Sequence, residues 1–513
     1  MTPTARAALA AGKRPIVVCL LRLRGGTVYA FGTEAAQIDQ RGIDTAPIQV
    51  SPGLVVDETE SAVDPFGLAG ETALSQAQVS IVLPASLAGA QGDWRYIGAA
   101  TAELARLWPG DDWQARESLL AGTRLSGLTL GVAGEPSTFT IEAARAETSA
   151  ALGNAARTVG LDFPTPIDAA GNPLSTLEGV EYPSVYGQPY RSQGLKIGEV
   201  GGDNYDRVII AGHAFAVLSN IEAYADGVSL GTFPVLNATT TGGDAYAYIR
   251  SNVLGTFDAT AGAITVWPRR GGIAAVNGTA AALSFGDLLE LWLSLSDLKV
   301  NWPAMRPALD RLRSWPGGVY MDAETPAIDA IRDHLLPLAP LIEMQSSGGV
   351  WFYYADLETP IVRGTLTEGQ ELVGRVGGVG LTEIEDIRNA VTVRYALDEF
   401  TGELVSAETV DADTDAAAYV SAQLYGTRAG EVIDAGAVGD GATARRVGRS
   451  YIQRRATQRR VTSWLLSDWA EVTIGDVYRV VAPSVGVDRA GVVTALAGGG
   501  GRVATFTILD GPL

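Results

Sequence analysis

Seven arginines close to the C-terminal end form the most concentrated set of chemically active side chains in this sequence. No Asp or Glu occurs between Gly441 and Ser467, although the chain carries a net charge of −20. Guanidinium groups bind carboxylates and phosphates through paired hydrogen bonds. Two interpretations stay open, a solvated face of an amphipathic helix and a surface that docks onto an acidic neighbouring subunit. The candidate interface residues are Arg445, Arg446, Arg449, Arg454, Arg455, Arg459 and Arg460.

Two shorter patterns resemble ligand-binding loops but lack required residues. The segment 439–444, Gly-Asp-Gly-Ala-Thr-Ala, approximates a dinucleotide fingerprint, but its third glycine is Ala444 and we expect no parallel strand–helix–strand unit around it. Asp411, Asp413 and Asp415 alternate as in a calcium loop, but the later glycine and glutamate of that loop are absent. We interpret the first as a turn into a helix and the second as an acidic helix N-terminus.

The sequence argues against most catalytic and metal chemistry. His213, His334 and the single Cys19 cannot build a zinc site with several His or Cys ligands or an iron–sulfur cluster within one subunit. No nucleophile elbow, zinc-hydrolase motif or P-loop is present. We therefore predict a protein that is not an enzyme and has no cofactor. A glycosidase needs only a pair of carboxylates, and no sequence motif marks such a pair.

The net negative charge also limits which partners the protein can bind. Stable nucleic-acid binding requires clustered Lys and Arg, which an acidic chain disfavours. The apolar run 16–21 ends at Arg22, too early for a signal peptide, and no run is long enough for a membrane-spanning helix. We expect an untargeted product of the cytoplasm.

Spacing of apolar residues and turn signals predicts an α+β, mainly β chain. Expected helices include 99–107, 304–315, 326–336, 414–425 and 443–457; the last would turn Val447, Tyr451 and Ile452 to a core and its arginines outward. We predict four domains: 1–190, an N-terminal β-barrel-like domain with connector; 205–283, a small inserted β domain; 284–385, a mixed helical and β domain; and 386–513, a C-terminal β-barrel-like domain with two helices.

Several segments together resemble the central hub family of bacteriophage tail tips, related to the contractile-phage central hub and the N-terminal part of lambda-like host-specificity proteins. The opening strands 15–21 and 26–31 resemble the family's first hairpin, and Tyr182–Pro189 resembles its connector. At the C-terminal end, the resemblance lies in the arginine-rich helix, the segment 464–472, Ile474-Gly475-Asp476 with its following strand, and the hairpin from Ala490.

The resemblance implies two barrel-like hub domains per subunit and a homotrimer that presents six similar barrels to a sixfold tail tube and threefold symmetry to the tip. The implied partners are the distal tail or tail tube protein, tip or fibre proteins and the tape-measure protein. It further implies assembly in the host cytoplasm, location in the virion at the tail tip, and a part in the channel for DNA ejection. Because the sequence continues into no receptor-binding extension, receptor recognition is expected to belong to another protein. The alternative is a carbohydrate-binding or carbohydrate-cleaving virion-associated β protein.

Overall fold

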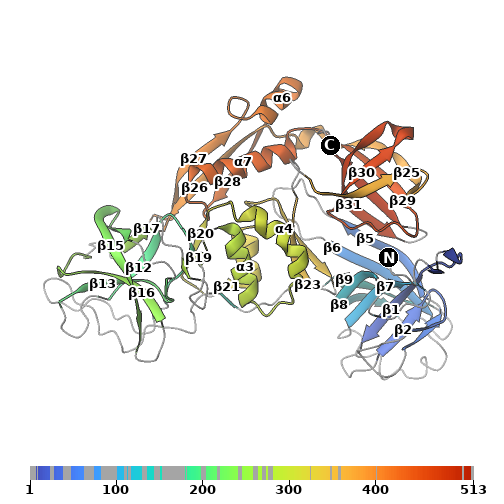
Figure 1. The fold of residues 1–513 in the computed structure, drawn as a ribbon, viewed down its shortest axis with the longest axis horizontal. Helices are drawn as coiled ribbons and strands as arrows, with labels where there is room; N and C mark the ends of the chain where they lie inside the picture. Colours follow the sequence, from blue (N-terminus) through green and yellow to red (C-terminus); the bar gives the residue numbers. More distant parts are fainter. Residues whose placement is uncertain are drawn as a thin grey trace.

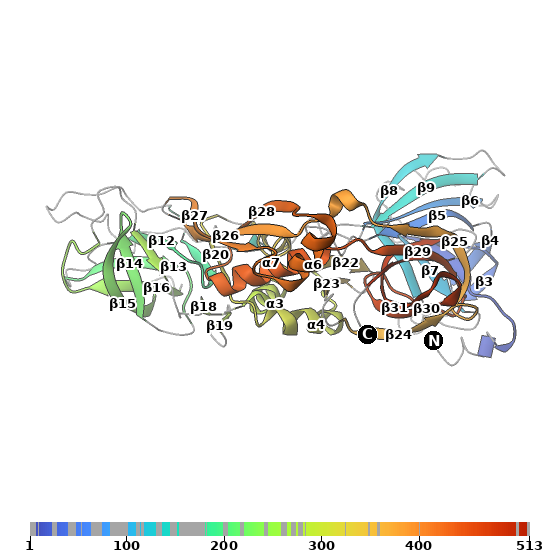
Figure 2. The same cartoon turned by 90° about the horizontal axis from the view of Figure 1, so that it is seen from above.

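The protein is described here by a computed structural model (Figure 1). A closed barrel lies at one end of an elongated molecule, helices and short sheets form its centre, and a large sheet forms the other end (Figures 1 and 2). The structure describes residues 7–8, 10–22, 28–38, 48–52, 54–62, 74–82, 101–108, 113, 117–129, 136–143, 151–152, 180, 182–197, 204–215, 220–240, 245–257, 264–267, 273–274, 281–282, 284–323, 325–346, 349–355, 360–399, 401–498 and 502–509.

One sheet of 15 strands joins the two ends of the chain. Its path is β25-β29-β32-β31-β5-β6-β9-β8-β7-β1-β2-β4-β3, and β30 attaches β24 to β31. The junction is the antiparallel pair of β31 with β5, whose backbone register places Leu496 opposite Ser61. The N-terminal strands are β1 (Ile16–Arg22), β2 (Val28–Gly32), β3 (Ala36–Ile38), β4 (Ile48–Pro52), β5 (Leu54–Ala62), β6 (Leu74–Val82), β7 (Thr101–Leu107), β8 (Glu117–Thr129) and β9 (Pro136–Ala143).

Strand β7 corrects the predicted helix at 99–107. It pairs with β1 on one side and with β8 on the other. Leu104 belongs to a core cluster with Cys19, whereas Leu107 belongs to a second cluster with Leu20. Alternate residues of both strands thus enter separate cores on the two faces of the sheet. Burial on both faces outweighs the helix propensity of Ala, Glu and Leu.

The C-terminal strands curve into a half-barrel around their own core, which includes Trp464, Tyr478 and Phe506. β25 is the last strand on the sheet path, and among the described strands its partner there is β29. The sequence patterns did not predict β24 or β25, because five glycines interrupt their apolar residues. The strands are β24 (Val362–Thr367), β25 (Leu372–Leu381), β29 (Arg460–Leu466), β30 (Val477–Ala482), β31 (Val487–Gly498) and β32 (Val503–Ile508), with a 3-10 turn η4 (Pro483–Val485).

The closed barrel has six strands in the order β12-β13-β16-β15-β14-β17. Its core contains Phe215, Val235 and Phe257. β14 and β15 form a hairpin, because Asp226 and Gly227 at its turn both take positive φ angles, 46° and 82°. The strands are β12 (Ser192–Lys196), β13 (Asp206–Ala211), β14 (Asn220–Ala225), β15 (Val228–Thr239), β16 (Ala245–Ser251) and β17 (Ile264–Trp267).

Among the described residues, the centre of the molecule packs five helices and several small sheets around one core. Ser284, Asn301, Asp415 and Asp440 cap the N-termini of α3, α4, α6 and α7 with side-chain oxygens. The helices are α3 (Phe285–Leu295), α4 (Trp302–Leu312), α5 (Ala327–His334), α6 (Ala416–Tyr425) and α7 (Gly441–Arg455), with a 3-10 turn η3 (Ile384–Asp386).

The central strands pair in small groups: β10 with β21, β11 with β20, β18 with β19, β22 with β23, and β26 with β27 and β28. Their bounds are β10 (Ala151–Leu152), β11 (Ser184–Gly187), β18 (Ile273–Ala274), β19 (Ala281–Ala282), β20 (Gly318–Met321), β21 (Thr325–Pro326), β22 (Leu341–Ser346), β23 (Gly349–Tyr354), β26 (Ala390–Asp398), β27 (Glu403–Val410) and β28 (Ala429–Ala435).

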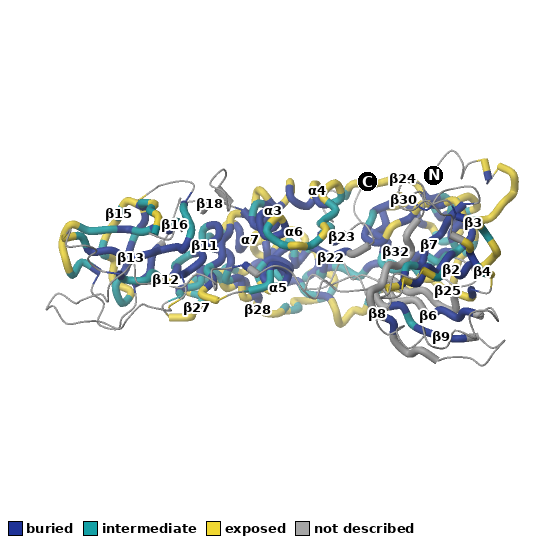
Figure 3. The backbone as a smooth tube through the Cα atoms, turned by 90° about the horizontal axis from the view of Figure 1, so that it is seen from below, coloured by how far each residue is buried: buried dark blue, intermediate teal, exposed yellow. Residues whose placement is uncertain are grey.

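The fold is therefore mainly β, as predicted, with a closed six-stranded barrel and a half-barrel. Buried backbone runs through the barrel, the centre and the large sheet, whereas β27 and β28 carry exposed stretches (Figure 3). Within the described ranges, none of the helices is both long and apolar enough to cross a lipid bilayer.

Candidate functional site

Helix α7 carries five of the seven predicted interface arginines. Asp440 begins the helix, since its carboxylate accepts hydrogen bonds from the backbone N–H of Thr443 at 2.9 Å and from its hydroxyl at 2.8 Å. Val447 and Tyr451 lie in the central core, as predicted. The helix lies against β26 and β27, where a Cβ on Gly448 would come within 2.6 Å of Val410. This close approach fixes which face of α7 remains outside.

Three of the arginines lie on that outer face. Arg445, Arg446 and Arg449 are exposed. Arg445 pairs with Glu408 of β27 at 3.0 Å, and Arg449 with Asp415 at 3.5 Å. Arg446 donates instead to the backbone carbonyl oxygen of Ser314. The outer face of α7 is thus only partly neutralised by carboxylates.

The other four arginines depart from the predicted single basic face. Arg454 and Arg459 are buried. Arg459 donates to the carbonyl oxygens of Arg454 at 2.6 Å and Gln453 at 2.5 Å, which satisfies the last turn of α7. Arg455 is partly buried, and Arg460, in β29, reaches the carbonyl oxygen of Gly486 at 3.4 Å. Arg459 therefore ends the helix and does not project from it.

A pocket of about 290 Å³ opens beside the outer face of α7. Arg446, Arg449 and Arg454 line one side, spaced so that they follow one stripe of the helix. The opposite side comes from the end of α4 and from the chain around β22 and β23. The complete lining is Ser314, Trp315, Pro340, Tyr354, Ala355, Arg446, Arg449, Ser450, Gln453 and Arg454.

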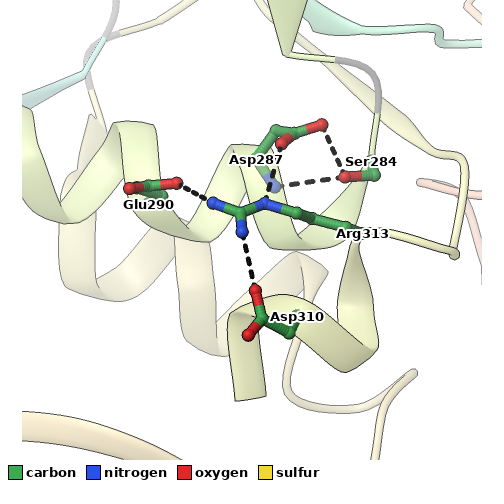
Figure 4. A network of polar contacts seen from close by, with 5 residues as sticks. All are labelled: Ser284, Asp287, Glu290, Asp310 and Arg313. Atoms are coloured by element: carbon green, nitrogen blue, oxygen red, sulfur yellow. Dashed lines mark hydrogen bonds and ion pairs between the residues drawn. The ribbon is translucent and has the colours of Figure 1, made fainter. Parts of the chain in front are cut away.

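Arg313 directly precedes Ser314 of the pocket lining in sequence, but its side chain lies among carboxylates. Arg313 contacts Glu290 at 2.7 Å, Asp310 at 2.7 Å and Asp287 at 3.6 Å (Figure 4). Asp287 is itself held by Ser284, which donates its hydroxyl to the carboxylate at 2.6 Å. The hydrogen bond to Glu290 and the neighbouring negative charges raise the pKa of Arg313. We call these five residues the Arg313 cluster.

The segment 439–444 is a helix-capping turn, as interpreted from the sequence. β28, which precedes the turn, pairs parallel with β26, but α7, which follows the turn, leads to β29 in a different sheet. A Cβ on Gly441 would lie 2.9 Å from a carboxylate oxygen of Glu408, and Asp440 already occupies the helix N-terminus. Two carboxylates at this position disfavour a phosphate.

The aspartates at 411, 413 and 415 form a turn and a cap. Asp411 accepts from the backbone N–H of Asp413 at 3.1 Å, and Asp415 accepts from those of Ala417 and Ala418 at 3.0 and 3.1 Å. Across the ranges that the structure describes, no group of three or more His, Cys, Asp or Glu is placed to hold a metal ion. Cys19 is buried, which raises the pKa of its thiol to about 12.

One carboxylate that the sequence did not single out has a strongly shifted pKa. Burial, followed by the negative charges of Asp322 and Asp398, raises the pKa of Glu399 to about 7. Asp398 forms an ion pair with Arg191 at 2.7 Å. The pKa of Glu399, in contrast, is set by burial and by two neighbouring negative charges. No sequence signal marks Glu399, because its burial and the approach of Asp322 arise only in the folded chain.

The structural neighbours of this chain are phage tail and baseplate proteins. The 43 kDa tail protein of prophage MuSo2 from Shewanella oneidensis is 8% identical, with 96% of this chain and 97% of that chain covered and a TM-score of 0.34. The tail protein from Neisseria meningitidis MC58 is 7% identical, with 96% of each chain covered and a TM-score of 0.37. A chain from the virion of a native gene transfer agent particle is 12% identical, with 69% and 89% covered and a TM-score of 0.42. No family model and no curated protein matches the sequence.

Proposed function

We propose that this protein is a structural, non-enzymatic subunit of a phage tail tip, where three copies form a hub between the sixfold tail tube and the threefold tip. The observation that carries the proposal is the pairing of β31 with β5, which joins the N-terminal and C-terminal strands in one sheet. Each subunit then contributes two strand-rich units side by side. Three subunits place six such units around one axis, which suits a closed cyclic assembly.

The edge strand β25 supports assembly into a larger particle. Val373 and Leu381 on this strand are 57% and 61% exposed, and Val376 and Val379 are also exposed. Glycines 374, 377 and 378 have open space where a Cβ would lie. A long, apolar edge strand invites pairing with another chain unless it is covered. A neighbouring subunit in the ring would cover it.

The charge of the chain supports a place beside the DNA channel. Fixed negative charge disfavours adsorption of phosphate, so DNA can pass an acidic lining without binding to it. The partners in this proposal are the distal tail or tail tube protein, the tip or fibre proteins and the tape-measure protein, within the virion. The arginines on the outer face of α7 are then candidates for a contact between chains.

Imaging of assembled tails with this subunit labelled tests the proposal. Density on the tail axis with three copies per particle is expected, and a position away from the axis would contradict it. Leu381→Lys should block incorporation into particles, because it adds a charge to the β25 edge. Val228→Lys is the matched control, since Val228 is 68% exposed on the hairpin of the closed barrel. Equal incorporation of both variants would exclude β25 as an assembly contact.

A further inference from the structure

We propose that the pocket beside α7, lined by Arg446, Arg449 and Arg454, binds carboxylate side chains of an acidic segment from a partner protein. The proposal goes beyond the hub function, because it assigns a binding site and a ligand class that neither the fold nor the symmetry of a hub requires. The partner's acidic segment would enter between α7 and the end of α4.

The charge of the pocket is the first argument. Three of its lining residues are arginines, and no Asp or Glu occurs among the described residues that line it. The carboxylate of Asp415 lies 3.5 Å from Arg449 and outside the lining, and Arg446 has only the Ser314 carbonyl oxygen as its contact in the described structure. Arg446 therefore brings to the pocket a positive charge that no carboxylate of the described residues neutralises.

The Arg313 cluster shows how this chain neutralises a guanidinium when no partner is needed. Arg313 is 45% exposed and still has three carboxylates within 3.6 Å. Arg446 lies on the same side of the molecule, since it contacts Ser314, the next residue after Arg313. Two neighbouring arginines thus differ in their charge compensation, and the one that lacks carboxylates faces a cavity.

The shape of the pocket favours a peptide over a nucleic acid. A volume of about 290 Å³ admits one or two side chains and is far too small for a duplex. Trp315 and Tyr354 provide aromatic walls, and Pro340 and Ala355 add apolar contact. Carboxylates on a flexible segment can form paired hydrogen bonds with guanidinium groups while the stem of the side chain packs on the aromatic wall.

Binding of a fluorescein-labelled hexaglutamate peptide to the full-length protein, followed by fluorescence anisotropy at low ionic strength, tests the proposal. The double variant Arg446→Ala/Arg449→Ala should weaken binding about tenfold or more, because charge-assisted hydrogen bonds are lost. Arg445→Ala is the matched control: Arg445 lies on the same helix and is equally exposed, but it pairs with Glu408 and is outside the lining. It should change binding less than about twofold.

A further variant, Arg446→Lys/Arg449→Lys, keeps the charge and removes the planar fork, and should bind with intermediate affinity. Thermal unfolding of each variant confirms that the fold is retained. Absence of peptide binding to the unmodified protein, or equal weakening by Arg445→Ala and by the double variant, would overturn the proposal. So would equal competition by a single-stranded oligothymidylate of six nucleotides, which would mark a phosphate site.

Discussion

The Arg313 cluster and the arginine pocket lie beside each other and use the same side chain in opposite ways. Arg313 lies among three carboxylates of α3 and α4, and its charge is neutralised within the chain (Figure 4). Arg446 contacts a backbone carbonyl oxygen and faces a cavity. Arg313 connects two helices of one subunit through its ion pairs. Arg446 has no carboxylate partner among the described residues, so in our proposal its guanidinium binds a carboxylate of another protein. Stability and binding should therefore respond differently to the same substitution at the two places.

The largest effect on stability is expected where the ion pair of an arginine is buried. Arg332 of α5 forms two hydrogen bonds of 2.9 Å with Glu343, whose side chain is fully buried. Arg332→Ala should reduce the free energy of unfolding by about 3 kcal/mol, because it leaves a buried carboxylate without its cation. Chemical denaturation measures the change. The double variant Arg332→Ala/Glu343→Gln should recover part of it, and a single-variant loss below about 1 kcal/mol would contradict this account.

The next effect concerns the helix crossing that brings Arg313 to its carboxylates. A Cβ on Gly286 of α3 would lie 2.5 Å from the carbonyl oxygen of Leu309 and 2.8 Å from the backbone nitrogen of Arg313. Gly286→Ala should therefore push α3 from α4 and cost about 2 kcal/mol of unfolding free energy. Gly364→Ala is a control, since its Cβ would meet nothing within 4 Å. Equal thermal shifts for the two variants would show that the crossing is not tight.

A smaller contrast is expected between the two arginines themselves. Arg313→Ala should cost at most about 1 kcal/mol, because the cluster is partly exposed and its ion pairs are screened by water. The loss should shrink as salt is added. Arg446→Ala should change stability by less than about 0.5 kcal/mol. Thermal unfolding at low and high salt compares the two, and a larger loss for Arg446→Ala would place its role inside the fold.

The comparison extends to a carboxylate, Glu399, for which burial and two nearby aspartates raise the pKa to about 7. The folded state holds this proton more tightly than the unfolded state, so the stability that it contributes at low pH is lost as pH rises toward about 7. Glu399→Gln should be more stable than the unmodified protein at pH 8, and the gap should narrow at pH 5. Solvent access to Glu399 keeps the effect small. A gap that does not vary with pH would contradict the raised pKa.

Local signals in the sequence predicted the central helices well. Asp440 before α7 is a capping residue, and the apolar spacing after it predicted the buried face that contains Val447 and Tyr451. The arginines of α7 were found for the same reason. The burial of Arg459 was not predicted, because its side chain turns back to donate to carbonyl oxygens of the last turn of α7.

Features that depend on distant segments were missed. The pairing of β31 with β5 joins parts of the chain more than 400 residues apart in sequence order, and no local pattern specifies it. The strand β7 reads as a helix until its burial on both faces is known. By contrast, the turn at Asp226 and Gly227 had a usable signal, since Asp-Gly favours a tight hairpin. The aromatic wall of the pocket comes from Trp315 and Tyr354, which approach α7 only in the folded chain.

The pairing of β11 with β20 has a consequence for how this molecule can change over evolutionary time. Tyr186 pairs with Val319 and Gly187 with Gly318, so the strand that leads into the closed barrel is held against β20, the strand that follows α4. A Cβ on Gly187 would lie 2.1 Å from the backbone carbonyl oxygen of Gly317, so β11 and the start of β20 are closely packed. The barrel strands β12 to β17 follow β11 and share no core cluster with α3 or α4, so changes within the barrel can accumulate while the central core stays intact.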